Sequence, residues 1–203
     1  MKIHRRVVQA AWFAVVLASA LVQLCAQVPP EALTRSGEIV VRGERHAYRM
    51  NYLPVNSFPE LPARVAAELQ HRGCRIPQTW QAHRPENVVQ ASLERPGSED
   101  WAVLCAVDGD VSLLVFFSSG GAPVVLAQET EVSRLLPIGE GIRYGFGWGI
   151  DPATPEQVHQ AQAAILPPPD RLDHDALADC TLERRTVYHF FTHGVWTVLT
   201  VPN

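Results

Sequence analysis

The residues best suited to chemistry are four aspartates that follow three consecutive prolines. Asp170, Asp173, Asp175 and Asp179 lie within the stretch DRLDHDALAD. Calcium prefers oxygen ligands, and compact loops supply them as carboxylates at alternate positions together with a backbone carbonyl. Asp173, Asp175 and Asp179 have the spacing of the third, fifth and ninth positions of such a loop. They are the predicted metal ligands.

Two departures from the calcium-loop pattern leave a second interpretation open. Arg171 stands at the first ligand position, and Ala176 stands where the loop needs a turn glycine. A polar connection in which Asp173 or Asp175 caps a short helical turn explains the same residues. Calcium is therefore the only cofactor that the sequence suggests, and this loop would bind it weakly.

Other reactive groups lack the neighbours that catalysis needs. His189 and His193 are four apart, but the residues around them predict a strand, on which such a pair lies ~13 Å apart. No Gly-x-Ser-x-Gly motif occurs. Lys2 is the only lysine, so a chain without its N-terminal segment has no amine for a Schiff base or phosphate loop. These patterns favour a non-catalytic binding or structural domain, with a calcium-assisted or carboxylate-based hydrolase as the alternative.

The N-terminal segment predicts export. Three basic residues among the first six precede an apolar stretch at 10–24, and the small residue Ala26 follows. This is typical of a secretory signal peptide, here at 1–26. The apolar stretch is shorter than the ~18–20 residues of a membrane span, so no span is expected after cleavage. Acylation of Cys25 is disfavoured because Leu24 is bulky, and we expect a secreted or periplasmic protein.

Removal of the signal peptide would leave an acidic chain. The segment holds three of the 17 basic residues and none of the 21 acidic residues, so the mature chain has a net charge of −7. This charge disfavours nucleic acid as a partner and leaves an unknown protein or small-molecule ligand. Residues 27–37 lack periodicity and predict a flexible lead-in to one domain at 38–203.

Periodicity and turn residues predict an α+β domain. Amphipathic helices are expected at 61–73 and at 154–166, where Thr154 and Gln157 can form a capping box. Strands are expected at 38–42, 46–52, 87–93, 100–107, 111–117, 124–132 and in a closing hairpin at 186–201. Asp108-Gly109 predicts a tight hairpin turn. The expected fold is an antiparallel sheet of about seven strands, formed by a central meander and the closing hairpin, with two helices packed on it.

A glycine-rich stretch at 139–150 alternates glycines with Tyr144, Phe146 and Trp148. A phosphate cradle would need a following helix with a lysine or hydroxyl in place. A strand with aromatics on one face, and glycines where other groups approach closely, fits better. The aromatic face is a candidate ligand groove.

Three cysteines follow the signal peptide. Cys74 follows the first helix and Cys105 ends an apolar strand, so we expect these two to pair in an oxidising compartment. The bridge would close a loop of about thirty residues and add roughly 3 kcal/mol to stability. Cys180 is then unpaired, either buried as a small apolar residue or available to a partner.

Two segments resemble the FG-GAP or VCBS-type repeat, in which a calcium loop leads into an apolar strand. SLERPGSEDWAVL matches it at Gly97, at Asp100 and at the start of the strand. DHDALADCTLERRTVYHF is similar to a second, degenerate copy. The resemblance implies two calcium-loop segments of about a dozen residues each.

Three longer stretches, RGCRIPQ, NVVQASLERPGSEDWAVLC and LDHDALADCTLERRTVYHFF, are similar to an uncharacterised family of secreted bacterial proteins. In that family the position of Ala176 is usually glycine, and cysteine is unusual at the position of Cys180. The resemblance therefore supports pairing of Cys74 with Cys105. It implies export and fold rather than an activity.

Overall fold

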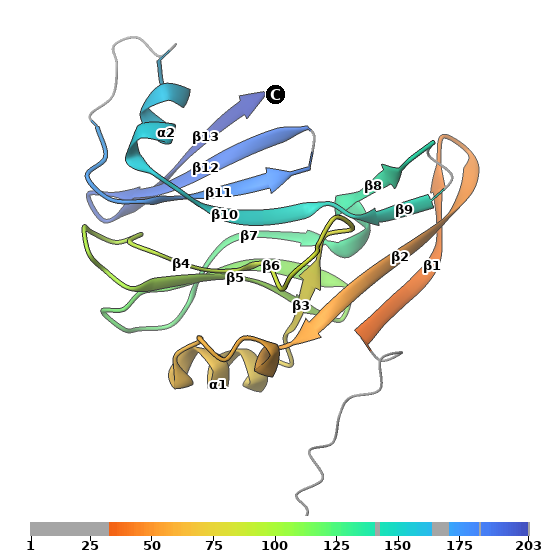
Figure 1. Cartoon of the computed structure of the whole chain (residues 1–203), viewed down its shortest axis with the longest axis horizontal. Helices are drawn as coiled ribbons and strands as arrows, with labels where there is room; N and C mark the ends of the chain where they lie inside the picture. Colours follow the sequence, from red (N-terminus) through yellow and green to blue (C-terminus); the bar gives the residue numbers. More distant parts are fainter. Residues whose placement is uncertain (1–32, 141–142, 164–170, 183, 203) are drawn as a thin grey trace, which may run out of the picture.

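The computed structural model, drawn in Figure 1, describes residues 33–140, 143–163, 171–182 and 184–202. The predicted signal peptide lies outside these residues. The helices are α1 (Ala63–His71) and α2 (Pro155–Ala161). The strands are β1 (Thr34–Val41), β2 (Glu44–Pro54), β3 (Arg75–Gln78), β4 (Val88–Ala91), β5 (Asp100–Val107), β6 (Asp110–Phe116), β7 (Val124–Thr130), β8 (Leu135–Ile138), β9 (Arg143–Phe146), β10 (Trp148–Ala153), β11 (Ala176–Thr181), β12 (Arg185–Thr192) and β13 (Val195–Pro202).

Four layers stack in the order α1, sheet A, sheet B and α2 (Figure 1). Sheet A has the order β7-β6-β5-β3-β2-β9-β8, with β1 paired to β2 and β4 paired to β5. Sheet B has the order β10-β11-β12-β13. Leu104 and Leu177 belong to the apolar core between the sheets, Val65 packs α1 on sheet A, and Val158 packs α2 on sheet B.

The predicted combination of mostly β structure with two helices packed on it is confirmed. The prediction of a single antiparallel sheet of about seven strands is wrong. The structure has two sheets, and β2 pairs with β9 in parallel. The glycine-rich stretch, predicted as one strand, divides at Gly147 into β9 of sheet A and β10 of sheet B. A Cβ atom at Gly147 would overlap the Leu136 side chain, so glycine allows the close passage between the sheets.

Predictions based on local signals are confirmed. Strands β4 to β7 form the antiparallel meander, and φ is 51° and 96° at the two turn residues 108 and 109. The closing hairpin turns at residues 193 and 194. Helix α2 has the capping box, in which the Thr154 hydroxyl accepts from the Gln157 N–H and the Gln157 side chain accepts from the Thr154 N–H.

The N-terminal hairpin begins earlier than the sequence predicts. Strand β1 starts at Thr34, inside the expected lead-in at 27–37, and pairs with β2 along eight residues. Most of its side chains are exposed. Because neither face of this part of the strand is buried, no hydrophobic alternation marks it in the sequence.

The predicted disulfide between Cys74 and Cys105 is confirmed. The two Cα atoms are 5.0 Å apart, and the bridge joins the end of the α1 segment to β5 across 31 residues. Both cysteines lie in the core between α1 and sheet A. Cys180, on β11, is free and partly buried, and this burial raises the pKa of its thiol.

Replacing both bridged cysteines, as Cys74→Ala with Cys105→Ala, is expected to lower the free energy of unfolding by about 3 kcal/mol, because the unfolded chain regains its loop entropy. Urea denaturation of both forms measures this difference.

Thiol titration of the denatured, unreduced chain from residue 27 should find one free cysteine. The Cys180→Ser variant, with the bridge intact, is the control and should have no reactive thiol. Three reactive thiols in the unsubstituted chain would contradict the bridge.

Candidate functional site

The three predicted calcium ligands lie in different environments. Asp173 is exposed, and its Oδ1 is hydrogen-bonded to Nδ1 of His174 at 2.8 Å, which lowers the pKa of the carboxyl group. Asp175 precedes β11, and Asp179 is buried on that strand at 3% exposure. In the described part of the chain, no three His, Cys, Asp or Glu side chains are grouped so as to hold a metal. Calcium binding stays a prediction.

The two segments that resemble calcium loops contact each other. The Ser92 N–H donates to Oδ2 of Asp175 at 3.0 Å, and the Asp175 N–H donates to the Ser92 carbonyl at 2.9 Å. This reciprocal pair joins the connection after β4 in sheet A to the start of β11 in sheet B. The Asp175 carboxylate therefore binds a backbone amide of the facing loop.

The connection between β4 and β5 is organised around the fully buried carboxylate of Asp100. Its Oδ2 accepts hydrogen bonds from the N–H groups of Leu93 and Glu94, at 2.9 and 2.8 Å, and from the Ser98 hydroxyl at 2.5 Å. Its Oδ1 accepts from the Ser118 N–H at 2.7 Å. Burial alone would raise the pKa of Asp100, but these hydrogen bonds outweigh it and lower the pKa. The Asp100 carboxylate, which matches the calcium-loop pattern in this segment, is therefore bound by donors of the protein itself.

The aromatic face predicted as a ligand groove is part of the core. Phe146 and Trp148 are 1% and 0% exposed, and Tyr144 is half-buried against the same core cluster. The packing between the sheets therefore fills this face. Two of the glycines, Gly145 and Gly147, lie at close approaches as predicted, and a Cβ atom at Gly145 would lie 2.7 Å from Cβ of Trp80.

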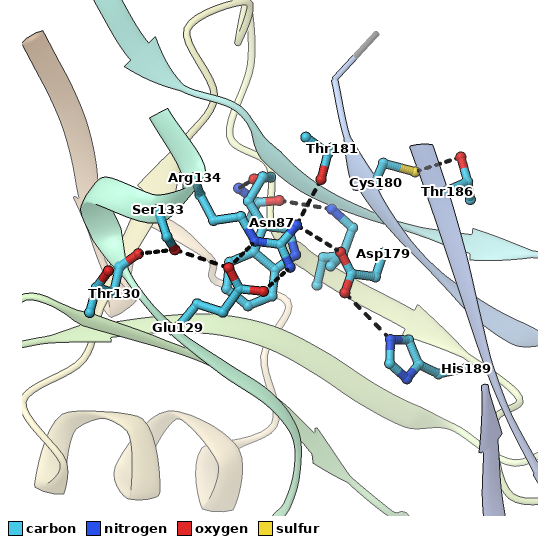
Figure 2. Close-up of polar contacts among 12 residues, drawn as sticks. Asn87, Glu129, Thr130, Ser133, Arg134, Asp179, Cys180, Thr181, Thr186 and His189 are labelled. Carbon is cyan, nitrogen blue, oxygen red and sulfur yellow. Dashed lines mark hydrogen bonds and ion pairs between the residues drawn. The ribbon is translucent and has the colours of Figure 1, made fainter. Parts of the chain in front are cut away.

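Figure 2 shows a cluster of polar and charged side chains around Arg134, with residues from both sheets. Arg134 ends the 3-10 helix η3 (Glu131–Arg134) and makes two hydrogen bonds to the Glu129 carboxylate, at 2.8 and 2.9 Å. It also donates to the Thr181 hydroxyl at 2.7 Å. Its guanidinium carbon lies 4.1 Å from the centre of the Trp148 ring, in a cation–π contact.

The same cluster includes Asp179, the third predicted calcium ligand. Its Oδ1 is 3.8 Å from Nη1 of Arg134, and its Oδ2 is 3.4 Å from Nε2 of His189 (Figure 2). These three side chains are between 4% and 6% exposed. His193 lies apart from them at the hairpin turn. Because Arg134, Asp179 and His189 are buried beside one another, we interpret the cluster as a structural link between η3 and sheet B.

A pocket of about 580 Å³ opens where β1, β2, β3, the β5–β6 turn and η3 meet. This volume is suitable for a small molecule. Polar and charged side chains dominate its walls, including Arg35, Tyr52, Arg75, Asp108 and Glu131. The pocket is therefore the candidate functional site.

Glu131 provides a buried carboxylate in the pocket wall, at 4% exposure. Its Oε1 accepts a hydrogen bond from the Tyr52 hydroxyl at 2.8 Å, and its Oε2 accepts from Nη1 of Arg35 at 2.6 Å. Its backbone N–H donates to the Gly109 carbonyl at 2.8 Å. Contacts to β1, β2 and the β5–β6 turn thus hold the carboxylate in one place.

The charge of Glu131 affects both hydrogen-bonding partners. Burial, followed by the hydrogen bond to Glu131 and the negative charge of that residue, raises the pKa of Tyr52. The hydroxyl therefore stays protonated and donating at neutral pH. The same negative charge raises the pKa of Arg35. Charged groups held in a pocket with perturbed pKa values are common in binding and catalytic sites.

The walls combine two kinds of recognition group. Arg35 and Arg75 can interact with an anionic or hydrogen-bond-accepting ligand group, and Glu131 and Asp108 can accept hydrogen bonds from ligand donors. These charged and polar walls suit a hydrophilic ligand.

Sequence reasoning did not identify Glu131, Arg134 or Arg35. Glu131 and Arg134 lie in the short polar link ETEVSR between two apolar segments. The charged residues of this link are the feature from which a site could have been predicted. Arg35 gave no signal, because it lies in the expected lead-in and its partner is 96 residues away.

Comparison of the chain with family models, with curated proteins and with solved structures found no match. The resemblances to calcium-loop repeats and to a family of secreted bacterial proteins stay predictions. The function is therefore inferred from the geometry of the pocket.

Proposed function

We propose that the mature chain is an exported, non-catalytic binding domain, stapled by the Cys74–Cys105 disulfide, that takes a small hydrophilic ligand into the pocket beside Glu131. The observation that carries this proposal is the carboxylate of Glu131, which is buried in the pocket wall and hydrogen-bonded to Arg35 and Tyr52. The matching ligand has both hydrogen-bond donors and acceptors, as free amino acids and sugars do.

Export is supported by the N-terminal composition and by the disulfide. Disulfides form and persist in oxidising compartments such as the periplasm and the extracellular space. Within the residues that the structure describes, no helix has the length and apolar character needed to cross a membrane.

The alternative, a hydrolase that uses the aspartates of the acidic loop, has no specific observation in its favour. Asp179 is enclosed with Arg134 and His189, and the Asp175 carboxylate binds a backbone amide. Asp173 is hydrogen-bonded to His174 at the surface. These carboxylates do not form the acid–base pair that such a mechanism requires.

A thermal-shift screen of the chain from residue 27 tests the binding proposal. The probes are free amino acids, mono- and disaccharides and small dicarboxylates at about 10 mM, a concentration that detects weak binding. We expect at least one class to raise the unfolding temperature, because a ligand at 100 times its dissociation constant adds about 2.7 kcal/mol of stability.

Two variants locate the site. Glu131→Gln removes the charge with little change of shape and is expected to abolish the shift, whereas Val132→Thr changes an adjacent, exposed side chain and should retain it. The proposal is wrong if no probe stabilises the unsubstituted chain, or if the shift is equal in Glu131→Gln.

A further inference from the structure

The pocket beside Glu131 presents charges of both signs to a ligand. Arg35 and Arg75 supply positive groups to its walls, and Asp108 supplies a negative group from the turn between β5 and β6. Arg75 and Asp108 are exposed, and the side chain of Arg35 is 51% exposed. A ligand that enters the pocket therefore meets charged side chains that are in contact with water.

Glu131 holds Arg35 in position. The Glu131 side chain is 6% exposed, and each of its oxygens already accepts a hydrogen bond, one from Tyr52 and one from Arg35. The bond from Arg35, at 2.6 Å, uses one of the five N–H groups of the guanidinium. Arg35 is therefore oriented by a buried carboxylate, while the exposed part of its guanidinium can bind an anion.

The Arg35 guanidinium lies against the turn that carries Asp108. A Cβ atom at Gly109, the residue after Asp108, would lie 3.4 Å from Nη1 of Arg35. The Gly109 carbonyl also accepts from the Glu131 N–H at 2.8 Å, which fixes the turn beside η3. A positive group and a negative group are thus close to each other in the pocket wall, on segments that the protein holds together.

Charge complementarity selects among hydrophilic ligands. A neutral sugar would cover Arg35 and Asp108 without supplying an opposite charge to either, and removing a charge from water is costly unless the charge is paired. A dicarboxylate would place a like charge beside Asp108, and a diamine would place one beside Arg35. A ligand with one carboxylate and one ammonium group can form an ion pair with each side chain.

We propose that the ligand of this pocket is a free amino acid, whose carboxylate is bound by Arg35 and whose ammonium group is bound by Asp108. The planar guanidinium can form two parallel hydrogen bonds with a carboxylate, and the Asp108 oxygens accept from an ammonium group. The volume of about 580 Å³ accommodates an amino acid together with its side chain. Amino-acid binding rests on the proposed function, because it names the ligand class of the same pocket.

Thermal unfolding of the chain from residue 27 with matched probes tests the ligand class. The probes are the common L-amino acids at about 10 mM. Each one that stabilises the chain is compared with its amine and its carboxylic acid, as L-alanine is with ethylamine and propionate. We expect at least one amino acid to raise the unfolding temperature. Its amine and its carboxylic acid should bind at least about tenfold more weakly, because each lacks one of the two charges.

Two variants assign the two ends of the ligand. Asp108→Asn removes the negative charge but keeps the turn, since asparagine also tolerates the φ of 51° at this position. It should lose the preference for the amino acid over its carboxylic acid. Arg35→Gln removes the positive charge and should lose the preference for the amino acid over its amine. Asp110→Asn, at an exposed position of the same hairpin, is the matched control and should keep both preferences.

Thermal unfolding of each variant without ligand establishes that it is folded. Stabilisation by a sugar or a dicarboxylate but by no amino acid, with the shift lost in Glu131→Gln, would overturn amino-acid binding and leave the proposed function standing. Equal binding of an amino acid and its amine or carboxylic acid would also overturn it, as would unchanged preferences in Asp108→Asn and Arg35→Gln. No stabilisation by any of these probes would overturn both amino-acid binding and the proposed function.

Discussion

Replacing Arg134 with methionine is expected to lower the free energy of unfolding by about 3–5 kcal/mol, the range observed when one partner of a buried ion pair is removed. Methionine retains much of the length and apolar volume of the side chain but leaves Asp179 between the sheets without its strongest cation. The substitution also removes both hydrogen bonds to Glu129 and the donor to Thr181. Urea denaturation at neutral pH measures the loss.

Two further variants separate the role of the cluster from a general effect of arginine. Arg184→Met, at an exposed turn position, is expected to change stability by less than about 0.5 kcal/mol. Asp179→Asn should lower the free energy of unfolding less in the Arg134→Met variant than in the unsubstituted chain, because the two side chains interact. Equal stability of Arg134→Met and Arg184→Met would show that the cluster does not hold the sheets together.

Asp100→Asn is expected to lower the free energy of unfolding by about 4 kcal/mol, because each hydrogen bond to a buried charge is worth about 1.5–3 kcal/mol. An asparagine keeps one acceptor oxygen but turns an NH2 group toward groups that donate hydrogen bonds to the carboxylate. The connection after β4 would therefore lose the anion on which Leu93, Glu94 and Ser98 converge. Asp110→Asn, at an exposed position of the β5–β6 hairpin, is the control.

The effect of Asp100 depends on pH in a defined direction. The pKa of Asp100 is lower in the folded chain than the ordinary value near 4 that applies when the chain is unfolded. The ionised group therefore stabilises the fold fully above about pH 5, and this contribution decreases as the pH falls below about 4. The stability difference between the unsubstituted chain and Asp100→Asn should shrink over that acid range. A difference that is constant from pH 7 to pH 3 would contradict the role of the carboxylate.

The sequence by itself determined the elements whose signals are local. The turn at 108–109 forms because these two residues adopt positive φ, and α2 begins where Thr154 and Gln157 complete a capping box. The meander could be predicted because its apolar strands are joined by short turns. The Cys74–Cys105 bridge could be predicted because the helix before Cys74 packs on the strand that carries Cys105. In each case the groups that interact are close in the chain, or are brought together by one predicted packing contact.

Only the tertiary structure decided how these elements divide into two sheets, and therefore which charges meet. Asp179 belongs to an acidic stretch that resembles a calcium loop, yet on β11 its carboxylate faces Arg134 and His189 between the sheets. Glu131 meets Arg35 and Tyr52 across 96 and 79 residues of chain. Hydrophobic periodicity specifies which face of a strand is buried, but not which strand lies opposite, because many pairings bury the same apolar surface. The choice of strand pairing determines which groups a buried charge meets. It also determines where the pocket lies.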